Sequence, residues 1–311
     1  MKILLIGHNR IGDTILSTAL INFLINKYEN SSFTIVTSSI SACIFENMPK
    51  LERLIISNKE KYSLHWLNIW LQTKSIKWDL IIDLRSSALV YFLNYKQKMI
   101  FKGNKFDHKL YQLQKFIGSS DEITPVIWAN KNNYEGIHEK KNLNNKYICI
   151  APMSNSVAKD WSMENYISLF ENDLFNSYVI VLLGATSDVR ELNIVNEFIK
   201  KSNHQIKNLI NDANMIETYF ILKKADLFLG SDSSNMHLAV VANIPTIGLF
   251  GPTDEKLYGP LGKNNLSIRG DKSFSEIVNQ LDYKSGKIKS YLDDLSVTKV
   301  YREIERILIS K

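Results

Sequence analysis

The sequence predicts an α/β protein with two domains, each built on a largely parallel sheet. Short apolar runs alternate with longer helical patterns along the chain, which is the signature of βαβ units. In the second half the apolar runs are nearly continuous, as expected of strands buried on both faces. The chain has 311 residues, and this length favours two domains of about 150 residues each.

The composition is that of an ordinary folded protein. The hydrophobic fraction is 45% and the charged fraction is 23%, which argues against disorder, collagen-like repeats and coiled coil. No apolar run reaches the roughly 18 residues that a membrane-spanning helix needs. The start MKILLIG is interpreted as a strand, because polar residues follow it directly. With only Cys43 and Cys149, far apart, we expect no disulfide or zinc site and a cytoplasmic protein.

Positive charge is concentrated in the first half. Residues 1–146 carry 20 Lys and Arg against 12 Asp and Glu, whereas residues 147–311 carry 18 against 20. Such a surface could attract an anionic membrane, nucleic acid or an acidic acceptor, or it could be a plain solvated surface rich in lysine. No aromatic-basic RNA motif or zinc finger is present, so we expect no nucleic-acid partner.

In the first half, four apolar runs predict strands that alternate with helices. These runs are KILLIG at 2–7, FTIVTS at 33–38, LERLIIS at 51–57 and DLIIDL at 79–84. Apolar residues recur at helical spacing from Asp13 to Tyr28, and Asp13 stands where an N-terminal cap would. The polar stretch 131–146 marks the boundary, so the first domain is expected to span residues 1–146.

A new series of strands begins after this boundary. It comprises YICIAP at 147–152, SYVIVLLG at 177–184, ADLFLGS at 225–231 and PTIGLFG at 245–251. Each run ends in a turn rich in Gly, Pro or Ser, which is where open α/β sheets bind ligands. The second domain is expected at 147–284, and the tail 285–311 is expected to form an amphipathic helix. Its apolar positions are Ile288, Leu292, Leu295, Val300, Ile304, Ile307 and Leu308.

Charged residues follow two strands of the first half. The turn after the first strand lacks the GxGxxG spacing, so no dinucleotide site is expected. Asp13 in this turn either caps the helix or acts as a general base facing the cleft between the domains. Arg10 and Arg85 stand at the carboxyl ends of strands, where they either meet an anionic acceptor or are simply exposed.

The first strand of the second half is followed by groups suited to phosphate. Ser154, Asn155 and Lys159 offer hydrogen-bond donors and one positive charge. Ser162, with Glu164 two residues later, predicts the start of a helix. We therefore expect this loop to contribute to an anion site.

A second candidate for that site follows the strand at 225–231. Asp232 and Ser233 could cap a helix whose free N–H groups bind an anion without a metal. His237 lies one helical turn further on, and it either faces the same site or is a packed histidine. The loop GPTDEKLYGP after the strand at 245–251 predicts a rigid turn, because it is rich in Gly and Pro.

These motifs agree in order, spacing and residue type with one family. They are Gly12-Asp13, Lys159-Asp160-Trp161, the segment Asp232 to His237, and Leu249-Phe250-Gly251-Pro252-Thr253. On them the sequence resembles the ADP-heptose:lipopolysaccharide heptosyltransferases, glycosyltransferase family nine, over nearly the whole chain. The resemblance implies a GT-B fold, in which two Rossmann-like domains face a central cleft and the C-terminal helix returns to the first domain.

The resemblance also implies a function. An inverting, metal-independent enzyme without a cofactor would move heptose or a related sugar from an ADP-sugar to a hydroxyl of a lipopolysaccharide or lipooligosaccharide core, or of another glycan. It would be a cytoplasmic protein of bacterial lipopolysaccharide biosynthesis, with peripheral contact to the cytoplasmic face of the inner membrane. A noncatalytic member of the family that binds a nucleotide or sugar is the alternative.

By the same resemblance, Asp13 looks like the catalytic base. Lys159, Asp232, Ser233, Ser234 and His237 look like the diphosphate pocket, with Asp188 toward the ribose and Met215 toward the adenine. Ser154 and Asn155 join the donor side as the loop donors named above, and Arg10 and Arg85 are assigned to the acceptor from their place at strand ends. One position departs from the family pattern, in which Thr-Gly stands where this chain has Ser233-Ser234. Ser234 adds a side chain where backbone and phosphate approach closely, so either the pocket shifts or the hydroxyl becomes a phosphate donor.

Overall fold

The chain forms two compact units in the computed structural model, which describes residues 1–284 and 289–309. The units are Met1–Asn133 and Tyr134–Lys311, so residues 134–146 belong to the second unit and not, as the sequence predicted, to the first. The reason is that helix α4 (Ile137–Lys140) packs on helix α7 (Met215–Leu222) of the second unit. Tyr134 adds a stacked ring contact to Phe220, with 4.8 Å between the ring centroids.

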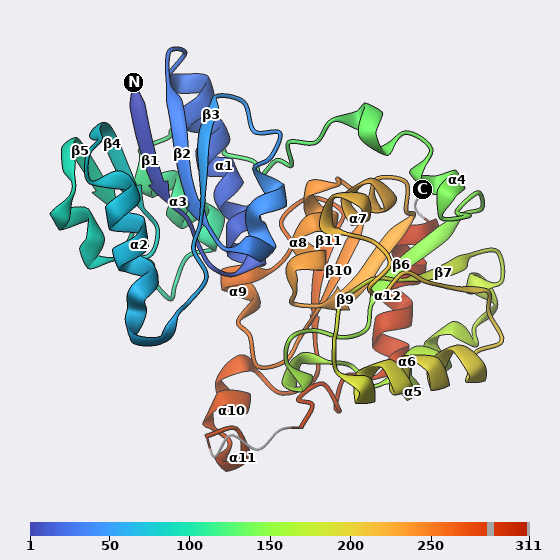
Figure 1. Cartoon of the computed structure of the whole chain (residues 1–311). Helices are drawn as coiled ribbons and strands as arrows, with labels where there is room; N and C mark the ends of the chain where they lie inside the picture. The colour runs from blue at the N-terminus through green and yellow to red at the C-terminus, as the bar shows by residue number, and fades with distance from the viewer. Residues whose placement is uncertain (285–288, 310–311) are drawn as a thin grey trace. The chain divides into compact units, whose positions relative to one another are not determined.

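The first unit contains a five-stranded parallel sheet in the order β3-β2-β1-β4-β5 (Figure 1). Its strands are β1 (Lys2–Ile6), β2 (Ser32–Thr37), β3 (Leu51–Ile56), β4 (Lys77–Asp83) and β5 (Asn94–Ile100). The first four confirm the predicted runs. Strand β5 was not predicted, because this edge strand is largely exposed and lacks an apolar pattern.

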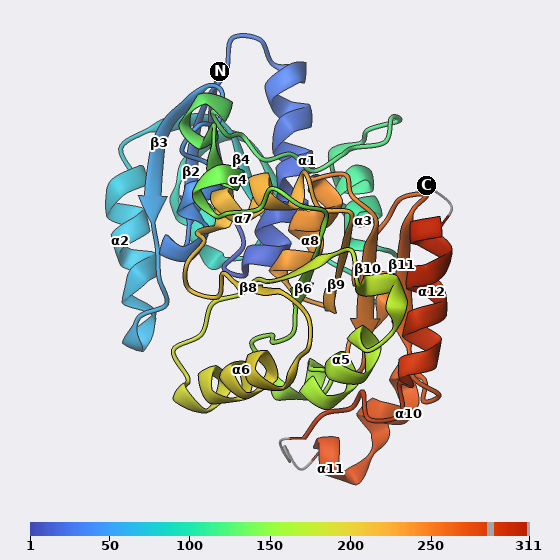
Figure 2. The same ribbon diagram turned by 90° about the vertical axis from the view of Figure 1, so that its right-hand side faces the viewer.

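Helices cover both faces of this sheet (Figure 2). Helices α1 (Ile11–Lys27) and α3 (Lys109–Ile117) lie on one face, and α2 (Leu64–Thr73) lies on the other with the short 3-10 helix η3 (Ala88–Phe92). Helix α1 starts two residues earlier than predicted. Its N-cap is Arg10, so Asp13 lies in the first turn and is not the cap.

The second unit contains a six-stranded parallel sheet in the order β11-β10-β9-β6-β7-β8. Its strands are β6 (Tyr147–Ala151), β7 (Val179–Leu182), β8 (Ile206–Asn208), β9 (Leu227–Ser231), β10 (Thr246–Phe250) and β11 (Asn265–Arg269). Strands β8 and β11 were not predicted and, like β5, they lie at sheet edges. In both sheets the order from the first strand is that of a Rossmann fold, and it reverses between β1 and β4 and between β6 and β9.

One face of this second sheet carries the main core. Helices α5 (Met163–Phe170), α6 (Val189–Lys201) and α12 (Val297–Ile309) bury their apolar sides there against β6, β7, β9, β10 and β11. Helix α8 (Ser234–Val241) packs on the opposite face, where a Cβ at Gly248 would lie only 2.5 Å from the Met236 sulfur. The remaining helices are α9 (Glu255–Tyr258), α10 (Phe274–Asn279) and α11 (Leu281–Lys284).

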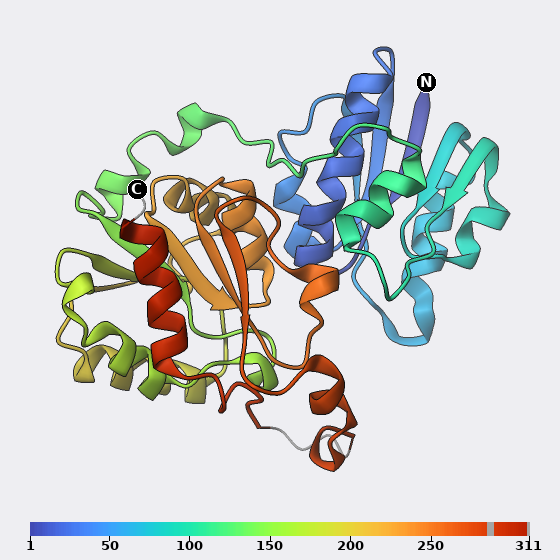
Figure 3. The same ribbon diagram turned by 180° about the vertical axis from the view of Figure 1, so that it is seen from behind.

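The C-terminal segment differs from its prediction in two ways. The helix begins only at Val297, and residues 289–296 form turns in which Leu292 and Leu295 are nevertheless buried. The predicted helical position Ile288 lies outside the described residues. Helix α12 belongs to the second unit and packs there on α5 (Figure 3), because its apolar stripe, with Val300 and Ile304, completes the core of the second sheet. Its return to the first domain stays a prediction. No helix among the described residues is long and apolar enough to span a membrane.

Candidate functional site

An ion pair joins the two strands at the switch point of the second sheet. Lys159 follows β6 and Asp232 follows β9, and the Lys159 Nζ lies 2.8 Å from the Asp232 Oδ2. The His237 Nε2 lies 3.8 Å from the other carboxylate oxygen of Asp232. Both carboxyl-terminal strand ends therefore contribute to one cluster, as the sequence predicted. Asp232 does not cap α8, since its carboxylate binds Lys159 instead.

The N-terminus of α8 offers an anion site beside this ion pair. Its N-cap is Ser233, whose side chain makes no capping hydrogen bond. Among the described residues, the Ser233 Oγ is buried and has no hydrogen-bond partner. The first N–H groups of a helix have no partner within the helix, and the helix dipole favours negative charge there. Together with the Lys159 ammonium, these donors suit a phosphate group.

The loop that carries Lys159 is held from both sides. The Ser231 hydroxyl donates to the Lys159 carbonyl at 2.6 Å. From the C-terminal segment, the Ser290 hydroxyl donates to the Asp160 carbonyl at 2.6 Å, and the Tyr291 N–H donates to the Ala158 carbonyl at 3.1 Å. The backbone that presents Lys159 is thus fixed before any ligand binds. Sequence reasoning missed these partners because they lie about 130 residues away along the chain.

Asp160 also fixes this loop, since its carboxylate accepts the Ser154 N–H at 2.8 Å. Burial raises the pKa of Asp160 to about 6, against hydrogen bonds from Ser154 that lower it. The Ser154 hydroxyl donates to the Ser156 carbonyl at 2.9 Å, while the Asn155 side chain is exposed. Trp161 is buried and donates to the Leu295 carbonyl at 2.9 Å, so its role in the motif is structural.

Two weaker donor-side candidates lie at helix starts on the same sheet. Asp188 caps α6, and its carboxylate pairs with Arg190 at 2.7 Å. Hydrogen bonds from the Arg190 side chain and backbone lower the pKa of Asp188 to about 2. Met215 is the first residue of α7, which begins with a capping box. Asp188 is thus engaged locally, and a ligand would have to compete with Arg190 for it.

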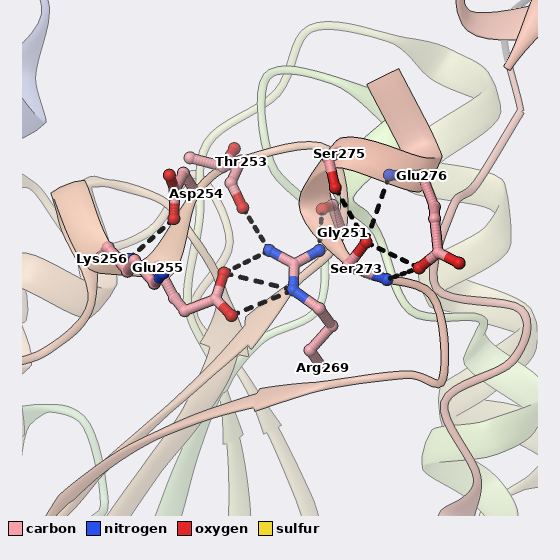
Figure 4. A network of polar contacts seen from close by, with 9 residues as sticks. All are labelled: Gly251, Thr253, Asp254, Glu255, Lys256, Arg269, Ser273, Ser275 and Glu276. Carbon is pink, nitrogen blue, oxygen red and sulfur yellow. Dashed lines mark hydrogen bonds and ion pairs between the residues drawn. The ribbon is translucent and has the colours of Figure 1, made fainter. Parts of the chain in front are cut away.

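Arg269 holds the Gly-Pro-Thr loop after β10 in place (Figure 4). Its guanidinium donates to the Gly251 carbonyl and, at 2.5 Å, to the Thr253 carbonyl. It also pairs with the Glu255 carboxylate, and its Nε lies 3.2 Å from both oxygens. Burial acts to raise the pKa of Glu255, but the bonds from Arg269 hold it below its usual value. The sequence predicted a rigid turn here but not this residue, because strand β11 was itself missed.

In the first unit, charged groups gather at the carboxyl ends of β1 and β4. Asp13 is partly buried in the first turn of α1. His8 follows β1 directly, and burial lowers its pKa, while the charge of Asp13 acts to raise it and those of Lys109 and Arg85 to lower it. His8 was not singled out from the sequence, although its place after a strand was a usable signal. Asp13 thus lies in a cluster of titratable groups.

Arg85 presents free donors at this edge. Its Nε donates to the Gly7 carbonyl at 2.5 Å, and the guanidinium lies 5.5 Å from the centre of the Trp66 ring. Neither Nη1 nor Nη2 has a hydrogen-bond partner among the described residues, although both are buried. The buried Asp83 fixes the turn by accepting the Arg85 N–H at 2.8 Å. Arg10 differs, since its side chain is exposed at the N-cap of α1.

The chain has two Rossmann-like sheets, and charged groups lie at the point in each sheet where the strand order reverses. This arrangement is that of the GT-B class of glycosyltransferases. The chain belongs to glycosyltransferase family 9 (heptosyltransferase), because the model of that family matches residues 40–284, more than half of the chain. Asp13 precedes the matched range. The protein is therefore a glycosyltransferase, and the predicted family is confirmed.

Individual relatives agree with this assignment. A lipooligosaccharide heptosyltransferase 2 of Campylobacter jejuni is 24% identical over 291 residues, which cover 86% of each chain. The solved structure of Escherichia coli ADP-heptose lps heptosyltransferase II covers 100% of this chain and 99% of its own, with a TM-score of 0.77 and 17% identity. The solved structure of Escherichia coli heptosyltransferase WaaC with ADP covers 99% of this chain and 100% of its own, with a TM-score of 0.73 and 17% identity. These structures confirm the predicted fold class.

Proposed function

We propose that this protein transfers heptose from ADP-heptose to a hydroxyl of a lipopolysaccharide or lipooligosaccharide core. The observation that carries the proposal is that Lys159, paired with Asp232, lies beside the N-terminus of α8, whose N-cap side chain makes no capping hydrogen bond. A diphosphate is the part of the donor that such a site recognises. The WaaC structure that shares this fold holds ADP, which supports a nucleoside diphosphate donor here.

On the donor side, the diphosphate either displaces the Asp232 carboxylate from the Lys159 ammonium or binds that ammonium together with Asp232. The Ser233 hydroxyl, which is buried without a partner, and the first N–H groups of α8 donate to phosphate oxygens. Ser234 adds a second hydroxyl at this helix start, and we assign it as a phosphate donor. Ser154, Asn155 and His237 line the remaining phosphate side in the proposal.

The nucleoside part of the donor is assigned to the neighbouring helix starts. Asp188, at the start of α6, binds the ribose hydroxyls in the proposal. Met215, at the start of α7, contacts the adenine. A sulfur-containing apolar side chain suits contact with an aromatic ring.

On the acceptor side, the Asp13 carboxylate takes the proton of the attacking hydroxyl. The hydroxyl oxygen forms a bond to the anomeric carbon as the bond from that carbon to the diphosphate oxygen breaks, and the electron pair leaves with ADP. Attack from the face opposite the leaving group inverts the configuration at that carbon. The free Nη donors of Arg85 bind an acidic group of the acceptor, and the exposed Arg10 contributes positive charge.

The proposed reaction uses no metal ion and no cofactor. The charge that develops on the departing diphosphate is stabilised instead by Lys159 and the α8 N-terminus, a preorganised electrostatic role. We further propose that the protein works at the cytoplasmic face of the inner membrane, where it makes peripheral contact. Turnover that persists in excess EDTA supports the metal-independent reaction, and its complete loss, restored by added metal, would contradict it.

A panel of ADP-, UDP-, GDP- and CMP-sugars tests the donor assignment. A ligand that binds only the native state raises the melting temperature, so ADP-heptose is expected to give the largest shift. Product analysis with a core oligosaccharide acceptor then separates the two candidate functions. Transfer of heptose supports the enzyme, whereas donor binding without transfer or hydrolysis supports the noncatalytic alternative.

A further inference from the structure

An apolar surface lies on the outer side of α2 and η3 in the first unit. We call it the α2 surface and define it by six exposed side chains: Tyr62, Leu64, Leu67, Leu71, Tyr91 and Phe92. The three leucines are each about half exposed, and Tyr62 is 94% exposed. Trp70 joins the two elements, since its indole N–H donates to the Phe92 carbonyl at 3.0 Å. The exposed leucines and aromatic residues therefore lie on neighbouring elements.

The helical spacing shows that these leucines are not part of the core of the unit. Helix α2 already buries the side of the helix that carries His65, Ile69 and Thr73. Leu64, Leu67 and Leu71 follow the i, i+3, i+7 pattern and so share a second stripe, which faces outward. A solvent-facing helix side normally carries polar residues, and a contiguous exposed apolar patch marks an interaction site.

Lysines surround this surface. Residues 57–98 carry seven Lys and Arg against three Asp and Glu. Of the three acids, Asp83 is fully buried, Asp79 is paired with Lys96 at 2.6 Å, and Glu60 is exposed. Lys59, Lys61, Lys74, Lys77 and Lys98 are exposed as well. The surface thus combines an apolar centre with a positive rim.

Two of these lysines lie over aromatic rings of α2 and η3. The Lys74 ammonium is 4.2 Å from the centre of the Trp70 ring, and the Lys98 ammonium is 4.0 Å from that of Tyr91. These are cation–π contacts, and Trp, Tyr and Lys are the residues enriched at a membrane interface. A leucine stripe flanked by Trp, Tyr and Lys has the composition of an interfacial helix.

We infer that the α2 surface docks on an anionic lipid bilayer, with its leucines and aromatic rings at the level of the lipid headgroups and its lysines on the phosphates. The charge favours this occupant over a second copy of the chain, because the positive rim would repel an identical surface. The inference rests on the proposed function for the peripheral membrane contact and the lipid-linked acceptor, and it adds the surface that makes this contact.

The fold connects this surface to the candidate acceptor groups within the same unit. Trp66 belongs to α2 and its ring faces the Arg85 guanidinium. Arg85 in turn bonds the Gly7 carbonyl at the edge from which α1 and Asp13 begin. The α2 surface and the Arg85 contact therefore belong to the same helix, so a bilayer bound to this surface holds a lipid-linked acceptor near the helix that contacts Arg85.

The test is flotation of the full chain with vesicles at about 0.15 M salt, where surface charges more than about 8 Å apart are screened. Vesicles of phosphatidylethanolamine and phosphatidylglycerol are compared with vesicles of phosphatidylcholine alone. The test variant combines Leu64→Gln, Leu67→Gln and Leu71→Gln, which keep a good helix former at exposed positions. The matched control combines Val189→Gln and Ile194→Gln, which replace exposed apolar residues of α6.

The wild-type protein and the α6 control are expected to float with the anionic vesicles. The leucine variant is expected to lose at least about tenfold in partition coefficient, since each buried apolar group contributes to interfacial binding. A Lys74→Gln, Lys98→Gln variant is expected to lose on the order of fivefold per lysine on anionic vesicles only. Circular dichroism equal to wild type shows that the variants are folded.

Three results would overturn the inference. The first is wild-type protein that stays unbound, and the second is a leucine variant that binds as well as wild type. The third is a leucine variant with a lower oligomeric state by light scattering, which would assign the surface to contact between copies. Turnover on a short water-soluble acceptor separates this test from the proposed function, because the leucine variant is expected to retain it in full.

Discussion

Replacing Arg269 by methionine is expected to destabilise the second unit strongly. Met keeps the apolar stem but removes the guanidinium that binds Gly251, Thr253 and Glu255. The Arg269 side chain is 12% exposed and that of Glu255 is 33% exposed, so the variant leaves a carboxylate partly buried without its partner. It also leaves two loop carbonyls without a donor.

The magnitude follows from these exposures. Breaking a buried ion pair by removing one partner costs about 3–5 kcal/mol. Because water reaches a third of the Glu255 side chain, part of that cost is screened, and about 2–3 kcal/mol is expected. Adding Glu255→Gln to Arg269→Met removes the unpaired charge, so the double variant is expected to recover about 1 kcal/mol.

Urea unfolding measures these differences, and hydrogen exchange of peptides from β10 to β11 assigns the loss to the second unit. Glu255→Gln alone completes the double-mutant cycle. If the free energy of unfolding of the Arg269→Met variant lies within about 0.5 kcal/mol of the wild-type value, the usual range of surface substitutions, Arg269 does not stabilise the loop as described. A double variant that is no more stable than Arg269→Met would also refute the reasoning.

Two further predictions concern the loop that carries Lys159. The raised pKa of Asp160, about 6, means that the folded protein binds an extra proton between about pH 4 and 6, so wild-type stability falls as pH rises through this window. Asp160→Asn removes this buried charge, so it is expected to raise the free energy of unfolding by up to about 2 kcal/mol at pH 8. At pH 4 the carboxyl is already protonated, and the variant is expected to change the stability little. An equal effect at both pH values would contradict this prediction. Lys159→Ala is expected to weaken ADP binding at least tenfold by calorimetry, since a charge-assisted bond contributes about 1.5–3 kcal/mol. The control Lys141→Ala removes a lysine that pairs with Asp212 at 2.9 Å and should leave the ADP affinity near wild type; equal losses in both variants would contradict the assignment of Lys159.

The central strands and the edge strand β3 could be predicted from the sequence, but the other three edge strands could not. Strands such as β6 and β9 are buried on both faces and therefore read as continuous apolar runs. The missed strands β5, β8 and β11 all lie at the edges of their sheets, where partial exposure removes the apolar pattern. In the C-terminal tail a helix was predicted too early. Leu292 and Leu295 fit the apolar pattern of that helix and are buried, but they lie in turns.

The candidate site was predictable as residue types at strand ends but not as a set of contacts. Asp232 was expected to cap α8, yet its carboxylate binds Lys159, 73 residues away in the sequence. A charge-assisted bond outweighs a cap of about 1 kcal/mol, and local reasoning does not include a partner so distant. Arg269 was missed for the same kind of reason, since its carbonyl and carboxylate partners are fixed only by the pairing of β10 with β11.

Heptose transfer by an Asp13→Asn variant, with ADP binding measured on the same preparation, decides whether Asp13 is the catalytic base. Asn keeps the shape of the side chain but cannot accept the acceptor proton. The rate of transfer is expected to fall by about 10² to 10⁴, the usual contribution of a positioned general base, while the ADP affinity stays at the wild-type value. Transfer at the wild-type rate with ADP affinity unchanged would contradict the assignment of Asp13 as the base.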